Sequence, residues 1–273
     1  MLTRFAPAPT GFLHLGHVVN ALYVWGYARE AGGRVLLRIE DHDRQRSRPE
    51  YERAILEDLA WLGFEPDGQP VRQSDRAEVY RAALARLVEQ GLVYGCSCTR
   101  ADLQQVPAGP GGERRYPGTC RSRGLGLEEG LGWRVRMAPG EERFDDHLLG
   151  PQAQDPSAQC GDLLLRDRLG NWTYQFAVVA DDCGQQITDV IRGVDLLAST
   201  GRQIRLARLL GRDTPPRFAH HPLVMKSATE KLSKSDGDTG VRDLRAAGWS
   251  AAQVLAKARA LVPWRIPPET PEI

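Results

Sequence analysis

The chain has 273 residues, and its 36 Lys and Arg nearly balance its 35 Asp and Glu, which leaves a net charge of +1. This balance excludes a protein that attracts nucleic acid through its overall charge, so any such partner must meet a local basic patch. No run of about twenty apolar residues predicts a membrane-spanning helix, and no basic segment with a long apolar run predicts a secretory signal. We therefore expect a cytoplasmic protein.

The N-terminal segment predicts a strand, a loop and a helix in quick succession. Leu2–Ala6 is typical of a short buried strand, Pro7, Pro9 and Gly11 break it, and Val18–Val24 is an apolar stretch with helical character. A strand that enters a helix through such a loop presents open backbone N–H groups and the positive end of the helix dipole. The segment is therefore suited to receive a phosphate group.

The pattern His14-Leu15-Gly16-His17 lies where the predicted helix begins. Gly16 has no side chain, so an adenine ring or a phosphate chain can approach the backbone closely. His14 and His17 are three residues apart on a helix, so they lie near one face and could both donate hydrogen bonds to a triphosphate. Two exposed histidines without a ligand are the alternative that this short pattern leaves open.

The longer stretch Arg4–His17 resembles the opening of the class I aminoacyl-tRNA synthetases of the glutamyl type, and Lys231–Ser235 resembles the second signature of that class. The two motifs stand in the family's order, and Ala8 departs from it because the family often has Ser there. The resemblance implies a mobile loop at the second signature that stabilises the leaving pyrophosphate. It also implies three sets of residues: for catalysis, His14, His17, Lys231 and Lys234; for ATP, His14, Gly16, His17 and Lys234; and for glutamate, Arg4, Phe5, Ala6, Pro7 and Ala8.

A second strand, Arg34–Glu40, completes a strand–helix–strand unit, which predicts a parallel sheet. Glu40, Asp41 and Asp43 stand at its carboxyl end, where open α/β sheets bind ligands. Taken alone, these carboxylates suit magnesium or a solvated turn. The family resemblance instead assigns Glu40 to the amino group of glutamate, a charge-assisted contact, and leaves the two aspartates as structure.

Caps and apolar spacing predict further elements. Ser47 caps a helix that runs to Leu62, and Ser74 opens a helix that ends at Gly91. We also expect a strand at 133–136, a hairpin of 162–167 with 172–176, a helix at 199–211, a strand at 223–225 and a last helix at 251–262.

Five cysteines, an odd number, favour metal binding or free thiols over a disulfide framework. Cys96 and Cys98 can share one tetrahedral ion, and Cys120 supplies a third thiolate. Tyr116 is the fourth donor in a comparable position, although phenolate is a rare zinc ligand because an ordinary Tyr has a pKa of about 10. Free thiols in a loop or, less readily, a redox site are the alternatives. The spacing C-x-C…Y-x-x-x-C resembles the zinc pattern of the short glutamyl-queuosine members of the family, which implies one structural zinc per chain.

The segments Tyr174–Asp182 and Ile187–Leu196 resemble the family's glutamate pocket. The resemblance implies that Tyr174 hydrogen-bonds the substrate and that Arg192 holds its side-chain carboxylate. A planar guanidinium suits this contact because it can form two parallel hydrogen bonds. Without the resemblance, Arg192 is equally well an arginine at a strand end, paired with a nearby aspartate. Arg4 is the other candidate cation.

The sequence thus predicts an α/β fold: a class I synthetase-like, Rossmann-like doubly wound parallel sheet with a zinc-bearing insertion and a short helical C-terminal part. We expect a monomer with no anticodon-binding domain. The expected domains are a split nucleotide-binding core at 1–95 and 161–225, the insertion at 96–160, and the second-signature loop with a C-terminal helix at 226–273.

The resemblance implies that ATP, with magnesium, activates L-glutamate to glutamyl-adenylate. Residues 236–273 are too few for a domain that reads the anticodon of a glutamate tRNA. Short family members that end here attach glutamate to queuosine in the anticodon of tRNA(Asp), and we expect the same acceptor. A truncated glutamyl-tRNA synthetase that charges a 3′ end, a cytidylyltransferase-like enzyme and a non-catalytic RNA-binding paralogue are the alternatives.

Overall fold

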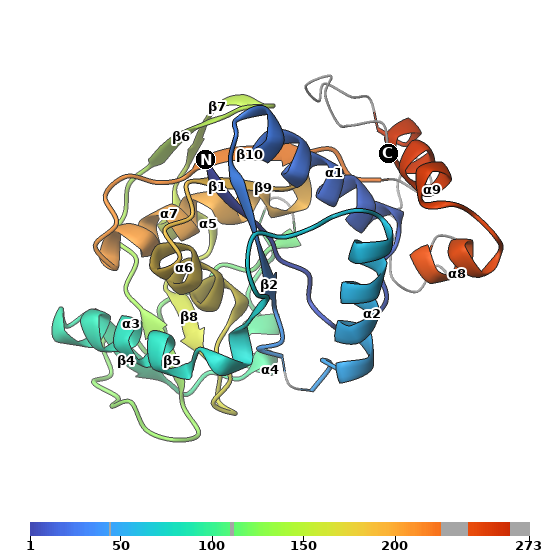
Figure 1. Cartoon of the computed structure of the whole chain (residues 1–273). Helices are drawn as coiled ribbons and strands as arrows, with labels where there is room; N and C mark the ends of the chain where they lie inside the picture. Colours follow the sequence, from blue (N-terminus) through green and yellow to red (C-terminus); the bar gives the residue numbers. More distant parts are fainter. Residues whose placement is uncertain (44, 110–111, 225–239, 263–273) are drawn as a thin grey trace. The chain divides into compact units, whose positions relative to one another are not determined.

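The computed structural model describes residues 1–43, 45–109, 112–224 and 240–262, which fall into two compact units (Figure 1). The first unit contains residues 1–75, 187–197 and the described residues from 216 onward, and the second contains residues 76–186 and 198–215. In these described ranges, no helix is both long and apolar enough to span a membrane.

The first unit alternates strands and helices. Its elements, in chain order, are β1 Leu2–Phe5, α1 Leu15–Glu30, β2 Arg34–Ile39, α2 Pro49–Trp61, β3 Val71–Arg72, a 3-10 turn at Gln73–Asp75, β9 Asp189–Gly193, β10 Arg217–His221, α8 Val241–Ala246 and α9 Ala251–Ala260.

The strands of this unit pair in parallel. β2 pairs with both β1 and β3, and β9 pairs with β10. Thr188, directly before β9, donates its backbone N–H to the carbonyl of Leu2 at 2.9 Å, so β9 lies beside β1. The strand order therefore reverses between β1 and β9, and ligands of open α/β sheets bind at the carboxyl ends of the strands at such a point. The parallel α/β sheet expected from the sequence is confirmed.

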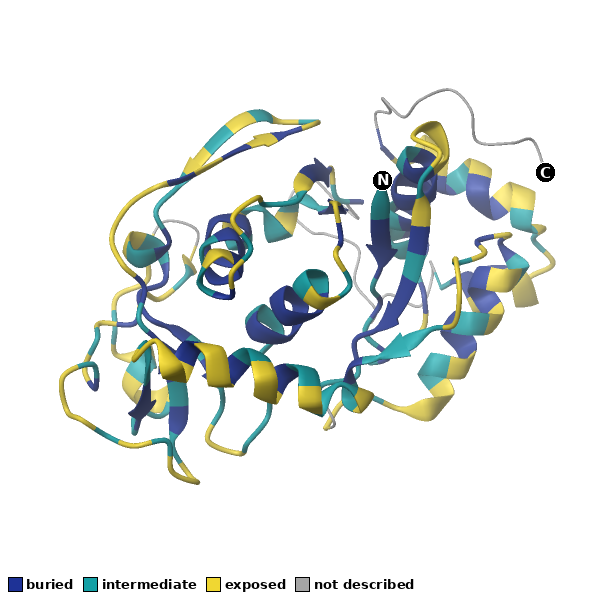
Figure 2. Ribbon diagram, turned by 60° about the vertical axis from the view of Figure 1, so that its left-hand side comes forward, coloured by how far each residue is buried: buried dark blue, intermediate teal, exposed yellow. Residues whose placement is uncertain are grey.

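β1 and β2 are buried along most of their length because a parallel sheet is covered on both faces. Figure 2 shows both strands largely in dark blue, and Phe5, Val35, Leu37 and Ile39 are all buried. α1 lies against β1, β2 and β9 and also contacts α9. Because it is enclosed in this way, most residues of α1 are buried, and its sequence is apolar rather than amphipathic.

The second unit combines antiparallel strands with helices. β5 pairs with both β4 and β8, and β6 pairs with β7. The elements are α3 Ala77–Glu89, β4 Val93–Cys96, α4 Arg100–Gln104, β5 Gly132–Val135, β6 Glu142–Asp146, β7 Gly150–Gln154, α5 Pro156–Gln159, β8 Leu163–Arg166, α6 Tyr174–Gly184 and α7 Thr200–Leu209. A 3-10 turn at Val194–Ser199, most of which belongs to the first unit, leads from β9 into α7.

One apolar core joins α3, β5, β8, α6 and α7, and it includes Tyr80, Val135, Leu165 and Phe176. Residues on both sides of the expected insertion at 96–160 therefore share this core. For that reason the compact units do not follow the domain boundaries expected from the sequence, and the assignment of 96–160 as an insertion stays a prediction.

Two predicted strands are wrong. The hairpin at 162–167 and 172–176 has only its first strand, because the chain from Tyr174 onward forms α6 and a single bridge joins Arg166 to Trp172. Residues 176–180 are all buried in the core because α6 packs against α3, α7 and β8. The strand expected at 223–225 lies instead at 217–221, where Pro222 ends it by lacking an N–H group; residue 225 lies outside the described residues.

Ser47 and Ser74 do not cap the helices that follow them. α2 has Arg48 at its N-cap position, and the backbone N–H of Ser47 donates instead to the carbonyl of Asp43. Ser74 lies in the 3-10 turn, its N–H donates to Asp41 at 2.8 Å, and α3 begins three residues later. In both places, hydrogen bonds to the loop after β2 replace the predicted cap.

Asp58 on α2 is a buried carboxyl group. Its side chain is 0% exposed, and neither oxygen has a hydrogen-bond partner among the described residues. Burial raises its pKa from 3.8 to about 6, against the charges of Arg242 and Arg245. Since the folded-state pKa lies above the unfolded value, the carboxyl group destabilises the fold progressively as the pH rises through this interval, and the effect is complete above it.

We therefore expect Asp58→Asn to raise the Tm at about pH 7.5 and to change it little at about pH 4, since only the ionised carboxylate carries the penalty. The pKa difference corresponds to a gain of about 3 kcal/mol at most. Thermal unfolding at both pH values measures this, with the exposed Asp213→Asn as the control that should change neither value. A gain of equal size at both pH values would contradict this explanation.

Candidate active site

The histidines of the first motif cap α1. His14 is the N-cap residue, and its Nδ1 accepts the backbone N–H of Gly16 at 3.0 Å, while Nδ1 of His17 accepts the N–H of His14 at 3.1 Å. The two ring centres are 3.9 Å apart. Because each Nδ1 is an acceptor, each neutral ring carries its proton on Nε2. The arrangement places two Nε2–H donors at a helix N-terminus, where an anion is stabilised.

Gly16 is required by the same geometry. A Cβ atom at this position would lie 2.9 Å from Cε1 and 3.0 Å from Nδ1 of His14. A larger residue would displace the His14 ring and break the cap. Glycine therefore serves the local fold as well as the close approach of a ligand that the sequence predicts.

Glu40 lies next to the loop that follows β1. β1 and β2 pair with Phe5 opposite Leu37, and the backbone N–H of Glu40 donates to the carbonyl of Pro7 at 3.0 Å. The side chain of Glu40 is 9% exposed, and its Oε1 lies 3.4 Å from Nη2 of the buried Arg38. The ion pair fixes the orientation of the carboxylate, which suits Glu40 to bind an ammonium group.

Arg4 and Arg192, the two candidate cations, are each 4% exposed and lie in the neighbouring strands β1 and β9. Arg192 donates its Nε–H to Nε2 of His220 at 3.0 Å and its Nη2–H to the carbonyl of Leu196 at 3.3 Å. Since Nε2 of His220 accepts, that ring is neutral and protonated on Nδ1. The imidazole therefore fixes the plane of the Arg192 guanidinium.

The structure brings most predicted site residues of the first unit to one edge of the sheet. Arg4–Ala8, Glu40 and Arg192 gather toward the carboxyl ends of neighbouring strands, and the paired histidines follow β1. Tyr174 is in the second unit, where it begins α6 and packs against the core, so its contact with a substrate stays a prediction.

Lys231 and Lys234 lie outside the described residues. On their C-terminal side, Gly240 forms a bridge with His14, and Val241 donates its backbone N–H to Leu13 at 2.9 Å. The chain that follows the second signature is therefore bound to the first signature.

Asp41 and Asp43 serve the loop after β2, as the sequence analysis expects. Asp41 accepts the N–H of Ser74, and Asp43 accepts the N–H of Gln45 at 3.1 Å and Nε–H of Arg46 at 2.7 Å. The hydrogen bond from Arg46 lowers the pKa of Asp43.

Three cysteines and a tyrosine form a second cluster, in the second unit. The Sγ atoms of Cys96, Cys98 and Cys120 lie within 4.8 Å of one another, and those of Cys98 and Cys120 are 3.7 Å apart. Oη of Tyr116 lies 3.4 Å from Sγ of Cys96 and accepts the backbone N–H of Cys120 at 2.9 Å. The structure thus brings together the four residues that the sequence suggests as metal ligands.

Two neighbours of the cluster favour thiolates. Arg134 of β5, 6% exposed, donates its Nε–H to Sγ of Cys96 at 3.3 Å, and its guanidinium lies 3.7 Å from the centre of the Tyr116 ring. At Cys120, burial opposes ionisation, but hydrogen bonds, led by that from Ser97, outweigh it and lower the pKa to about 6. The sequence analysis missed both Arg134 and Ser97.

Comparison with known proteins identifies the family. Residues 1–262 match the class I tRNA synthetases (E and Q), catalytic domain, so the chain belongs to this family. The glutamyl-Q tRNA(Asp) synthetase of Bordetella bronchiseptica is 48% identical over 239 residues, 86% of this chain and 75% of that protein. The Rhodobacter capsulatus protein of the same name is 41% identical over 276 residues, 93% and 98% of the two chains.

Solved structures share the fold. A glutamate tRNA ligase from Elizabethkingia meningosepticum, in complex with its amino acid, has a TM-score of 0.74 and 33% sequence identity, covering 87% of this chain and 52% of that one. The chain therefore spans about half the length of that solved structure. The glutamate–tRNA ligase of Thermosynechococcus vestitus is 41% identical, over 97% of this chain and 58% of that protein.

Proposed function

We propose that this chain activates glutamate with ATP and transfers it to queuosine in the anticodon of tRNA(Asp). Relatives named glutamyl-Q tRNA(Asp) synthetase, 41% to 48% identical over most of the chain, support this acceptor over the 3′ end of a tRNA. The observation that carries the activation step is the pair of histidine rings, 3.9 Å apart, at the sheet edge that also holds Glu40 and Arg192. The family match over residues 1–262 favours this reaction over that of a cytidylyltransferase.

In the first step, the α-carboxylate of glutamate attacks the α-phosphorus of ATP and pyrophosphate leaves. The Nε2–H groups of His14 and His17 hydrogen-bond the phosphate oxygens as negative charge builds on them, and Lys234 and Lys231 stabilise the departing pyrophosphate. Magnesium, when bound with ATP, would neutralise charge on the phosphates. The acceptor then attacks the carbonyl carbon of glutamyl-adenylate, and AMP leaves. The chain contributes position and charge rather than a covalent nucleophile.

Charge complementarity assigns the ends of glutamate. Glu40 faces the ammonium group, Arg192 and Arg4 face the side-chain carboxylate, and Tyr174 donates a further hydrogen bond. We assign Phe5, at the end of β1, and residues 6–8 of the loop that follows to the same site. With ATP, glutamate and tRNA as substrates, we place the enzyme in the cytoplasm and expect it to act as a monomer.

We also propose one structural zinc ion at the thiol cluster. Tetrahedral zinc, about 2.3 Å from sulfur and about 2.0 Å from oxygen, separates two sulfur ligands by about 3.8 Å and sulfur from oxygen by about 3.5 Å. The observed 3.7 Å between Cys98 and Cys120 and 3.4 Å between Cys96 and Tyr116 fit these spacings. Among the residues that the structure describes, only a few pack into the apolar cluster there, so an ion that joins β4 to the loop at 116–120 would supply stability that packing does not.

Amino-acid-dependent exchange of pyrophosphate into ATP tests the activation step without tRNA. We expect exchange with glutamate and far slower exchange with glutamine, because an amide cannot form a charge-assisted pair with Arg192. Equal exchange with the two amino acids, or exchange with neither, would refute the proposed specificity.

A further inference from the structure

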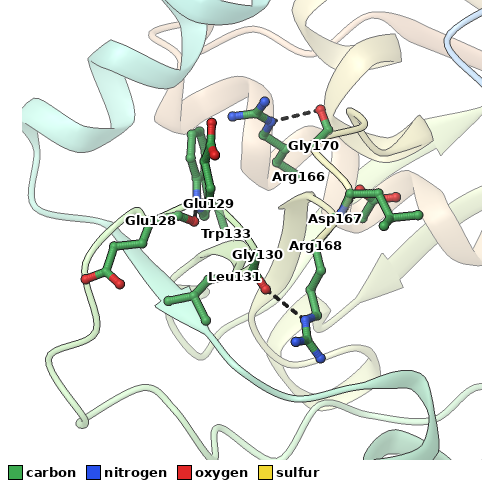
Figure 3. Close-up of a pocket in the computed structure, with 10 residues that line it drawn as sticks. Glu128, Glu129, Gly130, Leu131, Trp133, Arg166, Asp167, Arg168 and Gly170 are labelled. Carbon is green, nitrogen blue, oxygen red and sulfur yellow. Dashed lines mark hydrogen bonds between the residues drawn. The ribbon is translucent and has the colours of Figure 1, made fainter.

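A pocket of the second unit lies outside the residues assigned to activation and to zinc. Its volume is about 290 Å³, and it is formed by the segment that leads into β5 and the turn that follows β8 (Figure 3). Its lining residues are Glu128–Leu131, Trp133 and Arg166–Gly170. Leu169 at this turn is 75% exposed.

Backbone carbonyls hold the two arginines of this pocket. Nε of Arg166 donates to the carbonyl of Gly170 at 2.9 Å, and Nε of Arg168 donates to the carbonyl of Gly130 at 2.8 Å, as Figure 3 shows. Among the described residues, none accepts a hydrogen bond from the terminal nitrogens of either arginine. Both guanidinium groups are therefore positioned in advance and retain the donors that bind an anion.

The Arg166 guanidinium also adjoins aromatic rings. It lies 4.5 Å from the centre of the Trp133 ring and 5.4 Å from that of Trp172, so the rings restrain its plane. The carboxylate of Asp167 accepts two backbone N–H groups of its own turn. Hydrogen bonds from Thr99 and, to a smaller extent, the charge of Arg168 lower the pKa of Asp102, so this carboxylate also adjoins the pocket's second arginine. The exposed carboxylates of Glu128 and Glu129 add acceptors, so the lining offers both donors and acceptors, as the edge of a nucleobase does.

We propose that this pocket binds one unpaired nucleotide of the RNA substrate, with the base stacked against Arg166 and the phosphate at Arg168. Bases in single-stranded loops stack on aromatic rings and guanidinium planes, and arginines position the phosphate backbone. The mixed lining distinguishes this site from one for a free phosphate ion. The inference rests on the proposed function only in taking a tRNA as the substrate.

Binding of fluorescently labelled tRNA(Asp), followed by anisotropy over a range of salt concentrations, tests this inference. We expect Arg168→Ala to raise the Kd about tenfold and to reduce the salt dependence by about one phosphate contact. Leu169→Asp, at the exposed turn, should also weaken binding, because it adds a negative charge beside the phosphate. The matched control is Arg81→Ala, an exposed arginine of α3 that pairs with Glu78, which should leave the Kd within about twofold. Glutamate-dependent exchange should be unchanged in all three variants.

Equal tRNA binding by the wild type, Arg168→Ala and Leu169→Asp would overturn the inference, as would loss of exchange activity in Arg168→Ala. If both variants lose tRNA binding while the wild type transfers no glutamate to tRNA that carries queuosine, the pocket stands as an RNA site and the proposed function fails.

Discussion

Arg192→Ala is expected to lower kcat/KM for glutamate in the exchange reaction by at least about tenfold, because hydrogen bonds to charged groups contribute about 1.5–3 kcal/mol. The guanidinium is buried, and His220 holds its Nε at 3.0 Å, so the fork is oriented before the substrate arrives. The preference for glutamate over glutamine should fall in parallel, since a neutral amide gains little from the charge.

Arg192→Lys is the matched control for charge. Lysine retains the positive charge but lacks the planar fork and the Nε contact with His220, so its kcat/KM should lie between those of the wild type and Arg192→Ala. The KM for ATP should stay near its wild-type value in both variants, and thermal unfolding shows whether they remain folded. If Arg192→Ala has the same kcat/KM for glutamate as the wild type, Arg192 does not bind the substrate.

Cys98→Ser is expected to abolish zinc binding and to destabilise the second unit by about 3 kcal/mol or more, which lowers the Tm by roughly 6–12 °C. Its Sγ atom is 3.7 Å from that of Cys120, and losing one of four ligands leaves the remaining thiolates and the Arg134 guanidinium without the ion that joins them. Elemental analysis of protein purified without added metal should give about one zinc per wild-type chain. The rate of glutamate-dependent exchange, measured below the Tm of the variant, should stay close to that of the wild type.

Cys183→Ser is the matched control, because this half-buried thiol of α6 lies in the same unit but outside the cluster. It should retain zinc and change the Tm little. A Cys98→Ser protein that keeps its zinc and its Tm would rule out the metal site. Tyr116→Phe tests whether the phenolic oxygen is the fourth zinc ligand. If that variant holds zinc as tightly as the wild type, the oxygen is not a ligand.

The elements predicted correctly are those with local signals. Two examples are the loop between β1 and α1 and the strand β2. Pro and Gly residues within the loop, and the apolar run within the strand, are enough to predict each conformation. The segment from Trp172 to Phe176 is different, because its apolar residues suit a strand or a helix equally, and the shared core of α6 with α3 and β8 decides between them. Ser47 and Ser74 fit the pattern of caps, but their backbone N–H groups donate to the loop after β2, that of Ser47 to nearby Asp43 and that of Ser74 to Asp41, which is far away in the sequence.

In the candidate site, too, local sequence features could be predicted and contacts between distant residues could not. Motif spacing predicts which residues gather, and the pairing of His14 with His17 follows from their separation along a helix. Motif spacing does not predict the partners that orient the site residues: His220 of β10 fixes Arg192 of β9, and Arg134 of β5 reaches Cys96 of the paired strand β4. A signal for Arg134 did exist, because it alternates with Trp133 in a strand and therefore faces the opposite side, toward the thiols.

The acceptor is the central claim, and transfer of labelled glutamate measures it most directly. The enzyme is given ATP, labelled glutamate and tRNA(Asp) that either carries or lacks queuosine, each with and without its 3′-terminal adenosine. We predict label only on tRNA that carries queuosine, and equal labelling whether or not the terminal adenosine is present. Labelling of tRNA(Glu) that lacks queuosine at a comparable rate, or loss of label when only the 3′-terminal adenosine is removed, would contradict the account and indicate a glutamyl-tRNA synthetase that charges the 3′ end.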